Sequence, residues 1–221
     1  MNPVFPSILS TNFFDLHAKL NAFVAQGIDF IHLDIMDGHF VDTISFGPTL
    51  ARALKDKFPF RLDAHLMVSN PARMVPRFIE AGAEWLSFHL ETDADCEGLI
   101  GLIKKRGCRA GLVLNPDTPL ERVHPFLHTI DYVLLMSVFP GKGGQTFIAA
   151  TLERVRQLKR ELLRRQSPCL LQVDGGITVE NIARLKEAGA DLFVVGTHLY
   201  HAENIEKKIG QLLKRLQWSQ T

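Results

Sequence analysis

The chain has 221 residues, of which 46% are hydrophobic and 22% are charged, a composition typical of a folded globular protein. Its 25 basic and 24 acidic residues nearly cancel, which excludes a general basic field for nucleic acid or an anionic membrane. The three cysteines, Cys96, Cys108 and Cys169, are widely spaced and form no C-x-x-C pair, which argues against a disulfide framework and a cysteine-ligated metal.

The chain begins Met-Asn-Pro-Val-Phe-Pro, without a basic region ahead of an apolar stretch, so we do not expect a secretory signal. Its apolar runs are all far too short to span a bilayer. We therefore expect a cytoplasmic protein that binds neither membrane nor nucleic acid.

Short apolar runs typical of buried strands alternate along the chain with amphipathic segments typical of helices. Apolar side chains fall on one helical face at positions 16, 20, 23 and 24, and again between positions 205 and 216. The pattern predicts eight such helices. It also predicts strands at residues 4–9, 30–33, 61–66, 85–90, 110–114, 132–136, 170–173 and 192–195.

Several predicted helices end at a glycine that precedes a new strand, namely Gly27, Gly82, Gly107 and Gly189. Their separations are close to multiples of about 28 residues, one eighth of the chain and the length of one strand-helix unit. The sequence therefore predicts an α/β fold in which residues 1–221 form a single-domain (β/α)₈ TIM barrel. A doubly wound open sheet is the alternative, but no Gly-x-Gly-x-x-Gly turn follows the first strand.

Polar residues stand where three of the predicted strands end, and the active site of a barrel is built from these ends. His32 and Asp34 share one face of the second strand, Asp63 and His65 end the third, and Asp174 ends the seventh. A lone histidine there is usually a hydrogen-bonded core residue, but four ionisable groups in an apolar mouth require partners or a metal. The two imidazoles with Asp34 and Asp174 predict a site for Zn, Fe, Mn or Co rather than Mg or Ca.

The other histidines are interpreted as structural or surface residues. His89 ends the fourth strand, but no partner for it is evident in the sequence. The rest fall in predicted helices or loops: His17, His39, His124, His128, His198 and His201.

Glycine-bearing loops follow the last three predicted strands, in the sequences Pro-Gly-Lys-Gly-Gly-Gln (140–145), Gly-Gly-Ile-Thr (175–178) and Gly-Thr (196–197). Glycines let backbone N–H groups approach an anion, and this part of a barrel commonly binds phosphate. We expect Thr178 to cap a helix that begins near Val179. The alternative is that these loops are tight turns without a ligand.

Four segments together resemble the ribulose-phosphate 3-epimerase family: His-Leu-Asp-Ile-Met-Asp-Gly-His-Phe-Val (32–41), Asp-Ala-His-Leu-Met (63–67), Met-Ser-Val-Phe-Pro-Gly-Lys-Gly-Gly-Gln (136–145) and Val-Asp-Gly-Gly-Ile (173–177). The resemblance runs in order over residues 7–197. It implies a barrel of the ribulose-phosphate-binding type, in which His32, Asp34, His65 and Asp174 bind one divalent metal and Asp34 and Asp174 are the acid/base pair.

The resemblance also implies the substrate contacts. Three methionines match those that line the family's pocket, namely Met36, Met67 and Met136. The sugar phosphate would be held by Ser7, His65, Gly141, Lys142, Gly143, Gly144, Gly175, Gly176, Gly196 and Thr197.

The reaction implied is conversion of D-ribulose 5-phosphate to D-xylulose 5-phosphate in the pentose phosphate pathway, through a 2,3-enediolate. Inversion at carbon 3 needs a proton to leave one face and another to arrive on the opposite face. Asp34 and Asp174 lie three strands apart in an eight-membered ring, so they can flank a ligand in the mouth. Family members form homodimers or hexamers, so a homo-oligomer is expected.

Two loops depart from the family pattern, which usually has Pro-Asn in place of Asp42 and Thr43 and an aromatic residue in place of Lys142. Both departures bear on which sugar binds. Lys142 is interpreted as a contact to the phosphate or a sugar hydroxyl, or as a flexible surface residue. D-allulose-6-phosphate 3-epimerase and a non-catalytic sugar-phosphate-binding barrel remain alternatives. The Asp-x-Lys-x-x-Asp motif of related decarboxylases and the barrel lysine of a Schiff-base aldolase are absent.

Overall fold

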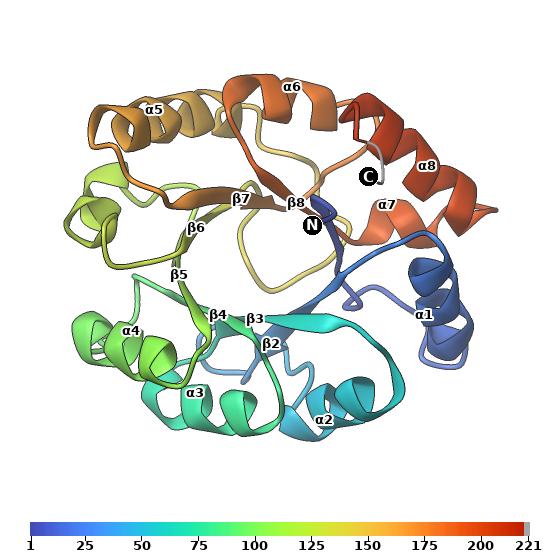
Figure 1. The fold of residues 1–221 in the computed structure, drawn as a ribbon, viewed down its shortest axis with the longest axis horizontal. Coiled ribbons are helices and arrows are strands. Elements are labelled where there is room, and N and C mark those ends of the chain that lie inside the picture. The colour runs from blue at the N-terminus through green and yellow to red at the C-terminus, as the bar shows by residue number, and fades with distance from the viewer. Residues whose placement is uncertain (219–221) are drawn as a thin grey trace.

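Eight parallel strands form a ring that is surrounded by helices (Figure 1). The computed structural model describes residues 1–218, so the last three residues of the predicted domain, 219–221, lie outside the described residues. Neighbouring strands follow the order β1-β8-β7-β6-β5-β4-β3-β2, which confirms the predicted barrel. The strands are β1 (Val4–Pro6), β2 (Phe30–Met36), β3 (Arg61–Met67), β4 (Trp85–His89), β5 (Arg109–Leu114), β6 (Tyr132–Met136), β7 (Leu170–Asp174) and β8 (Leu192–Val195).

The helices depart in two places from the expected one per strand. The segment between β5 and β6 forms a 3₁₀-helix, Leu120–Phe126, which contains Pro125, a residue without an N–H to donate. Two helices follow β8 instead of one. The α-helices are α1 (Leu16–Ala25), α2 (Pro48–Lys57), α3 (Pro71–Glu80), α4 (Cys96–Lys105), α5 (Thr151–Arg164), α6 (Ile182–Ala188), α7 (Thr197–Tyr200) and α8 (Ile205–Arg215).

The ring closes at the seam between β1 and β2. Strand β1 ends at Pro6, so the prediction of a strand over residues 4–9 is wrong at its C-terminal end. Ser7 forms a single parallel bridge with His32, and the N–H of Ile8 donates to the His32 carbonyl at 3.4 Å. The Ser7 hydroxyl accepts from the N–H of Leu9 at 3.2 Å, which turns the chain out of the strand.

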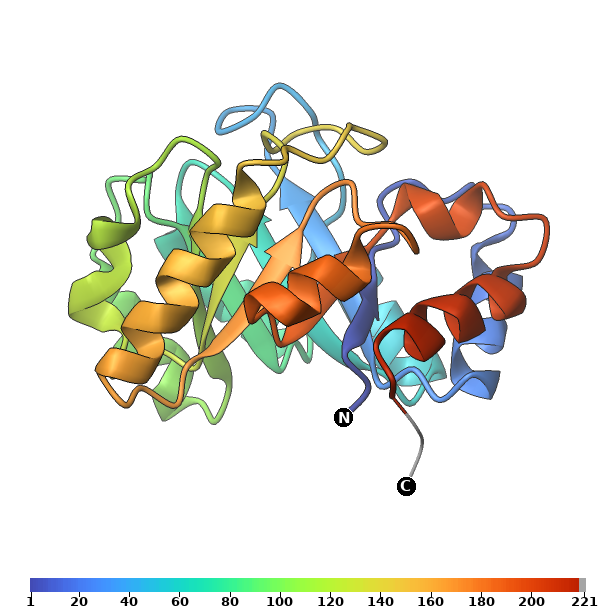
Figure 2. The same cartoon turned by 90° about the horizontal axis from the view of Figure 1, so that it is seen from above.

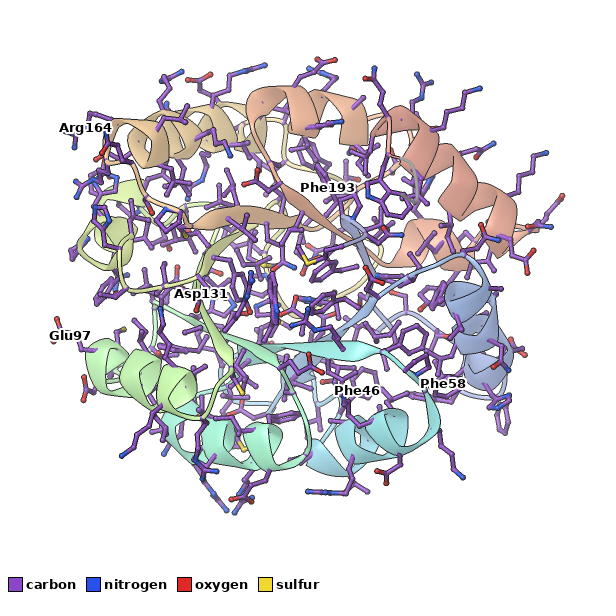
Figure 3. All side chains as sticks on the ribbon, viewed as in Figure 1. Phe46, Phe58, Glu97, Asp131, Arg164 and Phe193 are labelled. Atoms are coloured by element: carbon purple, nitrogen blue, oxygen red, sulfur yellow. The ribbon has the colours of Figure 1, made fainter. Side chains whose placement is uncertain are left out.

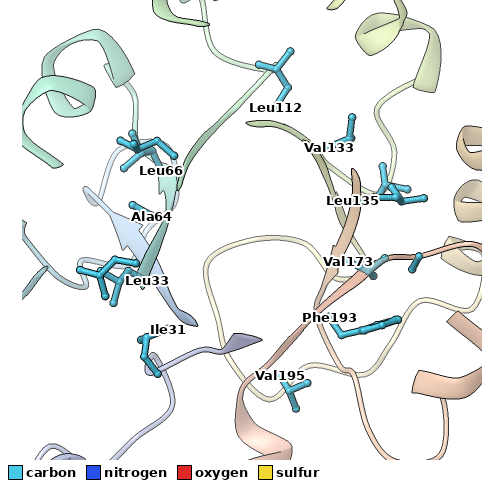
Figure 4. Close-up of a cluster of buried hydrophobic side chains, with 14 of the residues drawn as sticks. Ile31, Leu33, Ala64, Leu66, Leu112, Val133, Leu135, Val173, Phe193 and Val195 are labelled. Atoms are coloured by element: carbon cyan, nitrogen blue, oxygen red, sulfur yellow. The ribbon is translucent and has the colours of Figure 1, made fainter. Parts of the chain in front are cut away.

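The core has two layers, because successive strand residues point to opposite sides of the barrel wall. Outward-facing apolar side chains such as Leu33, Leu66 and Val173 pack between the ring and the helices (Figure 4). Inside the ring, Phe30, Trp85 and Tyr132 stand at the start of their strands and form an apolar floor. The ring centroid of Trp85 is 5.0 Å from that of Phe30 and 4.9 Å from that of Tyr132. Toward the other end of the strands the inward side chains become polar.

The polar end of the barrel lies opposite the chain termini. Figure 2 shows the long loops after β2 and β6 at one end of the ring and both termini at the other. Side chains fill the centre of the ring, whereas Glu97 of α4 and Arg164 of α5 project outward from the surrounding helices (Figure 3). Among the described residues, none of the helices is long and apolar enough to cross a membrane.

Candidate active site

The strand ends bring together the four residues predicted to bind metal. Pairing of β2 with β3 sets His32 beside Asp63 and Asp34 beside His65, so alternate residues of both strands face the barrel interior. One ligand atom from each of His32, Asp34, His65 and Asp174 lies within 4.8 Å of the others. We call these four residues the ligand quartet.

Both imidazoles of the ligand quartet present a free nitrogen to the two carboxylates. His32 Nε2 is 3.4 Å from Asp34 Oδ1 and 3.8 Å from Asp174 Oδ2, and His65 Nδ1 lies at the same two distances. Both nitrogens are buried and have no hydrogen-bond partner. Since unpartnered buried polar atoms are costly, and two nitrogens with carboxylate oxygens suit Zn, Fe, Mn or Co, the quartet fits a divalent transition metal.

Asp63 lies behind the ligand quartet and orients His32. Its Oδ2 is 2.8 Å from His32 Nδ1 and accepts from Gln172 Nε2 at 2.8 Å, while its Oδ1 accepts from the Tyr132 hydroxyl at 2.9 Å. A carboxylate on the second nitrogen is the usual support of a metal-binding histidine. Burial opposes a charge on His32, but Asp34 and Asp63 outweigh it and hold its pKa well above the ordinary value. This part of the barrel therefore attracts positive charge.

His65 is supported differently, through a second imidazole. Its Nε2 is 2.9 Å from Nε2 of His89, whose Nδ1 is 3.0 Å from Glu91 Oε2. His89, interpreted from the sequence as a structural or surface residue with no evident partner, therefore has two partners in the structure. The other oxygen of Glu91 accepts from the Asn115 N–H at 2.9 Å and from the Thr118 hydroxyl. Burial raises the pKa of Glu91, but hydrogen bonds from His89, Thr118 and Asn115 lower it to about 2.

The pKa values of the two carboxyls of the ligand quartet are shifted in opposite directions. Burial alone would raise the pKa of Asp34, but His32 and His65 hold it well below the usual range. The Ser7 hydroxyl also donates to Asp34 Oδ2 at 2.5 Å. Burial and the charge of Asp34 raise the pKa of Asp174 to about 7. Carboxyl pairs whose pKa values are separated in this way are typical of acid/base sites.

A cavity of about 460 Å³ opens directly above the ligand quartet, a size suited to a small metabolite. Asp34 and Asp174 reach its wall, whereas His32 and His65 are fully buried. Of the residues predicted to hold substrate, only His65 does not line the cavity. Its lining includes Met36, Met67, Met136, Ser7, Gly141, Lys142, Gly143, Gly144, Gly175, Gly176, Gly196 and Thr197.

The loops after β6 and β7 are packed so closely that there is no room for a side chain at Gly175 or Gly176. Gly175 and Gly176 have φ values of 119° and 61°, which favour glycine. A Cβ on Gly176 would lie 2.6 Å from the backbone nitrogen of Phe147, and one on Gly175 would lie 2.6 Å from Val138 Cγ2. The cavity is therefore bordered by bare backbone, which lets N–H groups approach an anion.

The loop after β7 differs from the prediction at Thr178. Helix α6 begins at Ile182, so the expected helix start near Val179 is wrong. The Thr178 hydroxyl still accepts from the N–H of Glu180 at 3.2 Å, the kind of bond that a capping residue makes, in the turn that precedes the helix. Asn181 holds the same turn together. Its Oδ1 accepts from the Thr178 N–H at 2.8 Å, and its side-chain amide donates to the Gly176 carbonyl at 2.9 Å.

Further polar residues at the cavity were not singled out from the sequence, among them Ser10, His198 and His201. His198, interpreted as a structural or surface residue, lines the cavity and accepts from the Val179 N–H at 3.2 Å. Ser10 lines it too, with its hydroxyl 2.8 Å from that of Thr197. Ser10 lies in a loop and His198 in the four-residue helix α7, and neither segment is long enough for a period in the sequence to predict the direction of a side chain.

The two loops that depart from the family pattern meet at the mouth of the cavity. The Thr43 hydroxyl donates to the Gly141 carbonyl at 2.7 Å and so joins the loop after β2 to the loop after β6. Lys142 is exposed beside this junction, and its carbonyl accepts from the Gln145 amide at 2.9 Å. Thr43 and Lys142 therefore both border the mouth of the cavity.

The chain is similar in sequence to known proteins. The profile of the Ribulose-phosphate 3 epimerase family matches residues 3–200. The ribulose-phosphate 3-epimerase of Aquifex aeolicus is 42% identical over 207 residues, covering 94% of this chain and 93% of that protein. The protein of the same name from Escherichia coli K12 is 39% identical over 212 residues, covering 96% of this chain and 94% of that one.

Among solved structures, 3-hexulose-6-phosphate synthase from Salmonella typhimurium superimposes with a TM-score of 0.74 at 15% identity, covering 98% of this chain and 99% of that one. At this identity the likeness shows a shared barrel fold and nothing about substrate. The sequence matches reach further, since they span nearly the whole chain and include every strand that carries the ligand quartet. The chain belongs to the ribulose-phosphate 3-epimerase family.

Proposed function

We propose that this protein is a metal-dependent 3-epimerase that interconverts D-ribulose 5-phosphate and D-xylulose 5-phosphate. The observation that carries the proposal is the pair Asp34 and Asp174, which reach the cavity wall directly above two unpartnered imidazole nitrogens. Relatives about 40% identical over most of their length bear the name ribulose-phosphate 3-epimerase. We further propose that it acts in the cytoplasm as a homo-oligomer, a dimer or a hexamer.

The two carboxyls account for inversion at carbon 3. One of them takes the C3 proton, the C–H electrons form the C2–C3 double bond of a 2,3-enediolate, and the other delivers a proton to the opposite face. Asp34 and Asp174 come from β2 and β7, on opposite sides of the β1–β2 seam, so a ligand can lie between them. The reaction needs one carboxyl ionised and the other protonated at the start, and their states exchange at each turnover.

The ligand quartet would hold one divalent ion, Zn, Fe, Mn or Co, through His32, Asp34, His65 and Asp174. Such an ion supplies electrophilic stabilisation of the negative charge that develops on the C2 oxygen of the substrate. The hydroxyl of Ser7 donates to Asp34 Oδ2, while Oδ1 faces the quartet, so the two oxygens of this carboxylate have different partners.

The rest of the cavity would orient the sugar phosphate. We assign the phosphate to the bare backbone of the loops after β6, β7 and β8, with Thr197 and the positive charge of Lys142 at its edge. Met36, Met67 and Met136 form an apolar wall that limits access of water to the enediolate. His65 is fully buried and does not line the cavity, so we assign it to the metal ion rather than to direct contact with the substrate.

The test is proton NMR in D₂O with metal-reconstituted protein, in which ribulose 5-phosphate and allulose 6-phosphate are offered separately. We expect deuterium to enter at carbon 3 as the epimer appears, and faster with ribulose 5-phosphate. Faster exchange with allulose 6-phosphate would identify a D-allulose-6-phosphate 3-epimerase instead. No exchange with either sugar would refute the epimerase and leave a sugar-phosphate-binding barrel.

A further inference from the structure

The imidazoles of His65 and His89 meet edge to edge inside the barrel wall. Their Nε2 atoms are 2.9 Å apart, while the ring centroids are 5.0 Å apart and the ring planes are inclined by 26°. Both side chains are fully buried, so water does not compete for this contact. Two neutral imidazoles that meet in this way share a single proton, which means that one ring donates and the other accepts.

The direction of the contact follows from Glu91 at its outer end. A carboxylate accepts only, so His89 Nδ1, 3.0 Å from Glu91 Oε2, must carry the proton of that ring. His89 Nε2 then has a lone pair and accepts from His65 Nε2. His65 in turn has its lone pair on Nδ1, the nitrogen that faces Asp34 and Asp174 without a hydrogen-bond partner.

We propose that His89 and Glu91 are positioning residues that set the tautomer of His65 and thereby keep its Nδ1 available to a metal ion. The inference rests on the metal centre of the proposed function. It assigns to His65 the support that Asp63 gives directly to His32, with a second imidazole interposed between ligand and carboxylate.

Glu91 is itself held by the loop after β5. Its Oε1 receives two donors, the Asn115 N–H and the Thr118 hydroxyl. Arg154 of α5 donates to the backbone carbonyls of the same two residues, at 3.2 Å and 2.7 Å. A segment that contributes no side chain to the ligand quartet therefore determines which nitrogen of a quartet histidine is free.

The decisive variant is Glu91→Gln, which exchanges one oxygen for NH₂ and keeps the shape of the side chain. The two donors at Oε1 retain the amide carbonyl there, so the NH₂ group faces His89 Nδ1. His89 must then accept at Nδ1 and donate from Nε2, and the proton of His65 moves to Nδ1. The substitution thus reverses both tautomers without changing any member of the ligand quartet.

Two measurements test this. In histidine-¹⁵N-labelled, metal-free protein, ring-nitrogen shifts distinguish protonated from bare nitrogens, and we expect His65 Nδ1 to be bare in the wild type and protonated in Glu91→Gln. Competition with a chromophoric chelator gives the Zn²⁺ affinity, which we expect to fall by about 10- to 100-fold. His89→Leu should lose affinity similarly, whereas His89→Gln, whose carbonyl reaches the position of Nε2, should stay within a few-fold of wild type.

The matched control is Asp191→Asn, which alters a carboxylate that accepts the Leu171 N–H at 2.8 Å just before β8, at the opposite end of the barrel. It should leave both readouts unchanged. If Glu91→Gln does not fold, the pair His89→Leu and His89→Gln provides the same comparison. Unchanged tautomers and wild-type Zn²⁺ affinity in these variants would overturn the inference while leaving the metal centre intact. A wild-type protein that binds no Zn²⁺ would refute the metal centre itself, and the inference with it.

Discussion

Replacement of Asp174 by asparagine is expected to abolish turnover and yet, in protein stripped of metal by a chelator, to stabilise the fold. The Asp174 side chain is only 14% exposed and lies 3.8 Å from the nearest nitrogens of His32 and His65. Burial and the charge of Asp34 raise its pKa from 3.8 to about 7. An asparagine has the same shape and never has to carry a charge in this position.

The magnitude follows from proton linkage. Between pH 4 and 7 the unfolded chain has already lost the Asp174 proton while the folded protein still holds it, so the free energy of unfolding falls as pH rises. Above pH 7 the loss is complete and amounts to about 4 kcal/mol, at 1.36 kcal/mol for each pKa unit. This is an upper limit, because water entering the open mouth would hydrate part of the carboxylate.

Urea denaturation in EDTA at a series of pH values from 4 to 8.5 measures the effect. The two proteins should be equally stable near pH 4, and Asp174→Asn should become the more stable one as the pH passes 7. Zn²⁺ should reverse the order above pH 7, since only the wild type retains the complete ligand quartet. If the two stabilities fall in parallel from pH 4 to 8.5, the reasoning about the buried carboxyl is refuted.

Three further changes test other parts of the site. Asp34→Asn should lower kcat by about 10³-fold or more with substrate binding partly retained, and near-normal turnover would contradict the two-base assignment. Lys142→Phe should raise KM several-fold, whereas an unchanged KM would show that the lysine does not contact the substrate. Gly176→Ala forces a Cβ to within 2.6 Å of the Phe147 nitrogen at a φ of 61°. It should therefore cost about 2–4 kcal/mol in urea denaturation and raise KM, and wild-type stability would exclude the close backbone contact.

The barrel and its ligand quartet were predictable because both depend on short-range patterns. The period of two along β2 places His32 and Asp34 on one face, and parallel strands bring their C-terminal ends to one mouth. The helix ends were predictable for the same reason, since Gly27 and Gly189 have the positive φ values that a glycine after a helix adopts, 67° and 111°.

Contacts that depend on register and loop geometry were not predictable from the sequence. His89 meets His65 because β3 and β4 pair in one particular register, and Glu91 reaches His89 from the loop that follows. The start of α6 was misplaced because Thr178 and Asn181 are both suited to a helix N-terminus, and both take part in the turn that precedes the helix. Asp63 was recognised as a strand-end residue, but its three partners come from three different strands.

An ion bound to the ligand quartet would also affect the motions of the barrel, because of the seam between β1 and β2. The strands there are joined by the single Ser7–His32 bridge, and the ligand quartet has members on both sides: three on β2 and β3, and Asp174 on β7. A motion that separates β1 from β2 would also move the ligands apart. An ion bound to the quartet would therefore act as a cross-link between the two sides of the seam. Amide hydrogen exchange near Ile8 should slow when the ion binds, and the lifetime of the closed ring should then be set by the rate at which the ion dissociates.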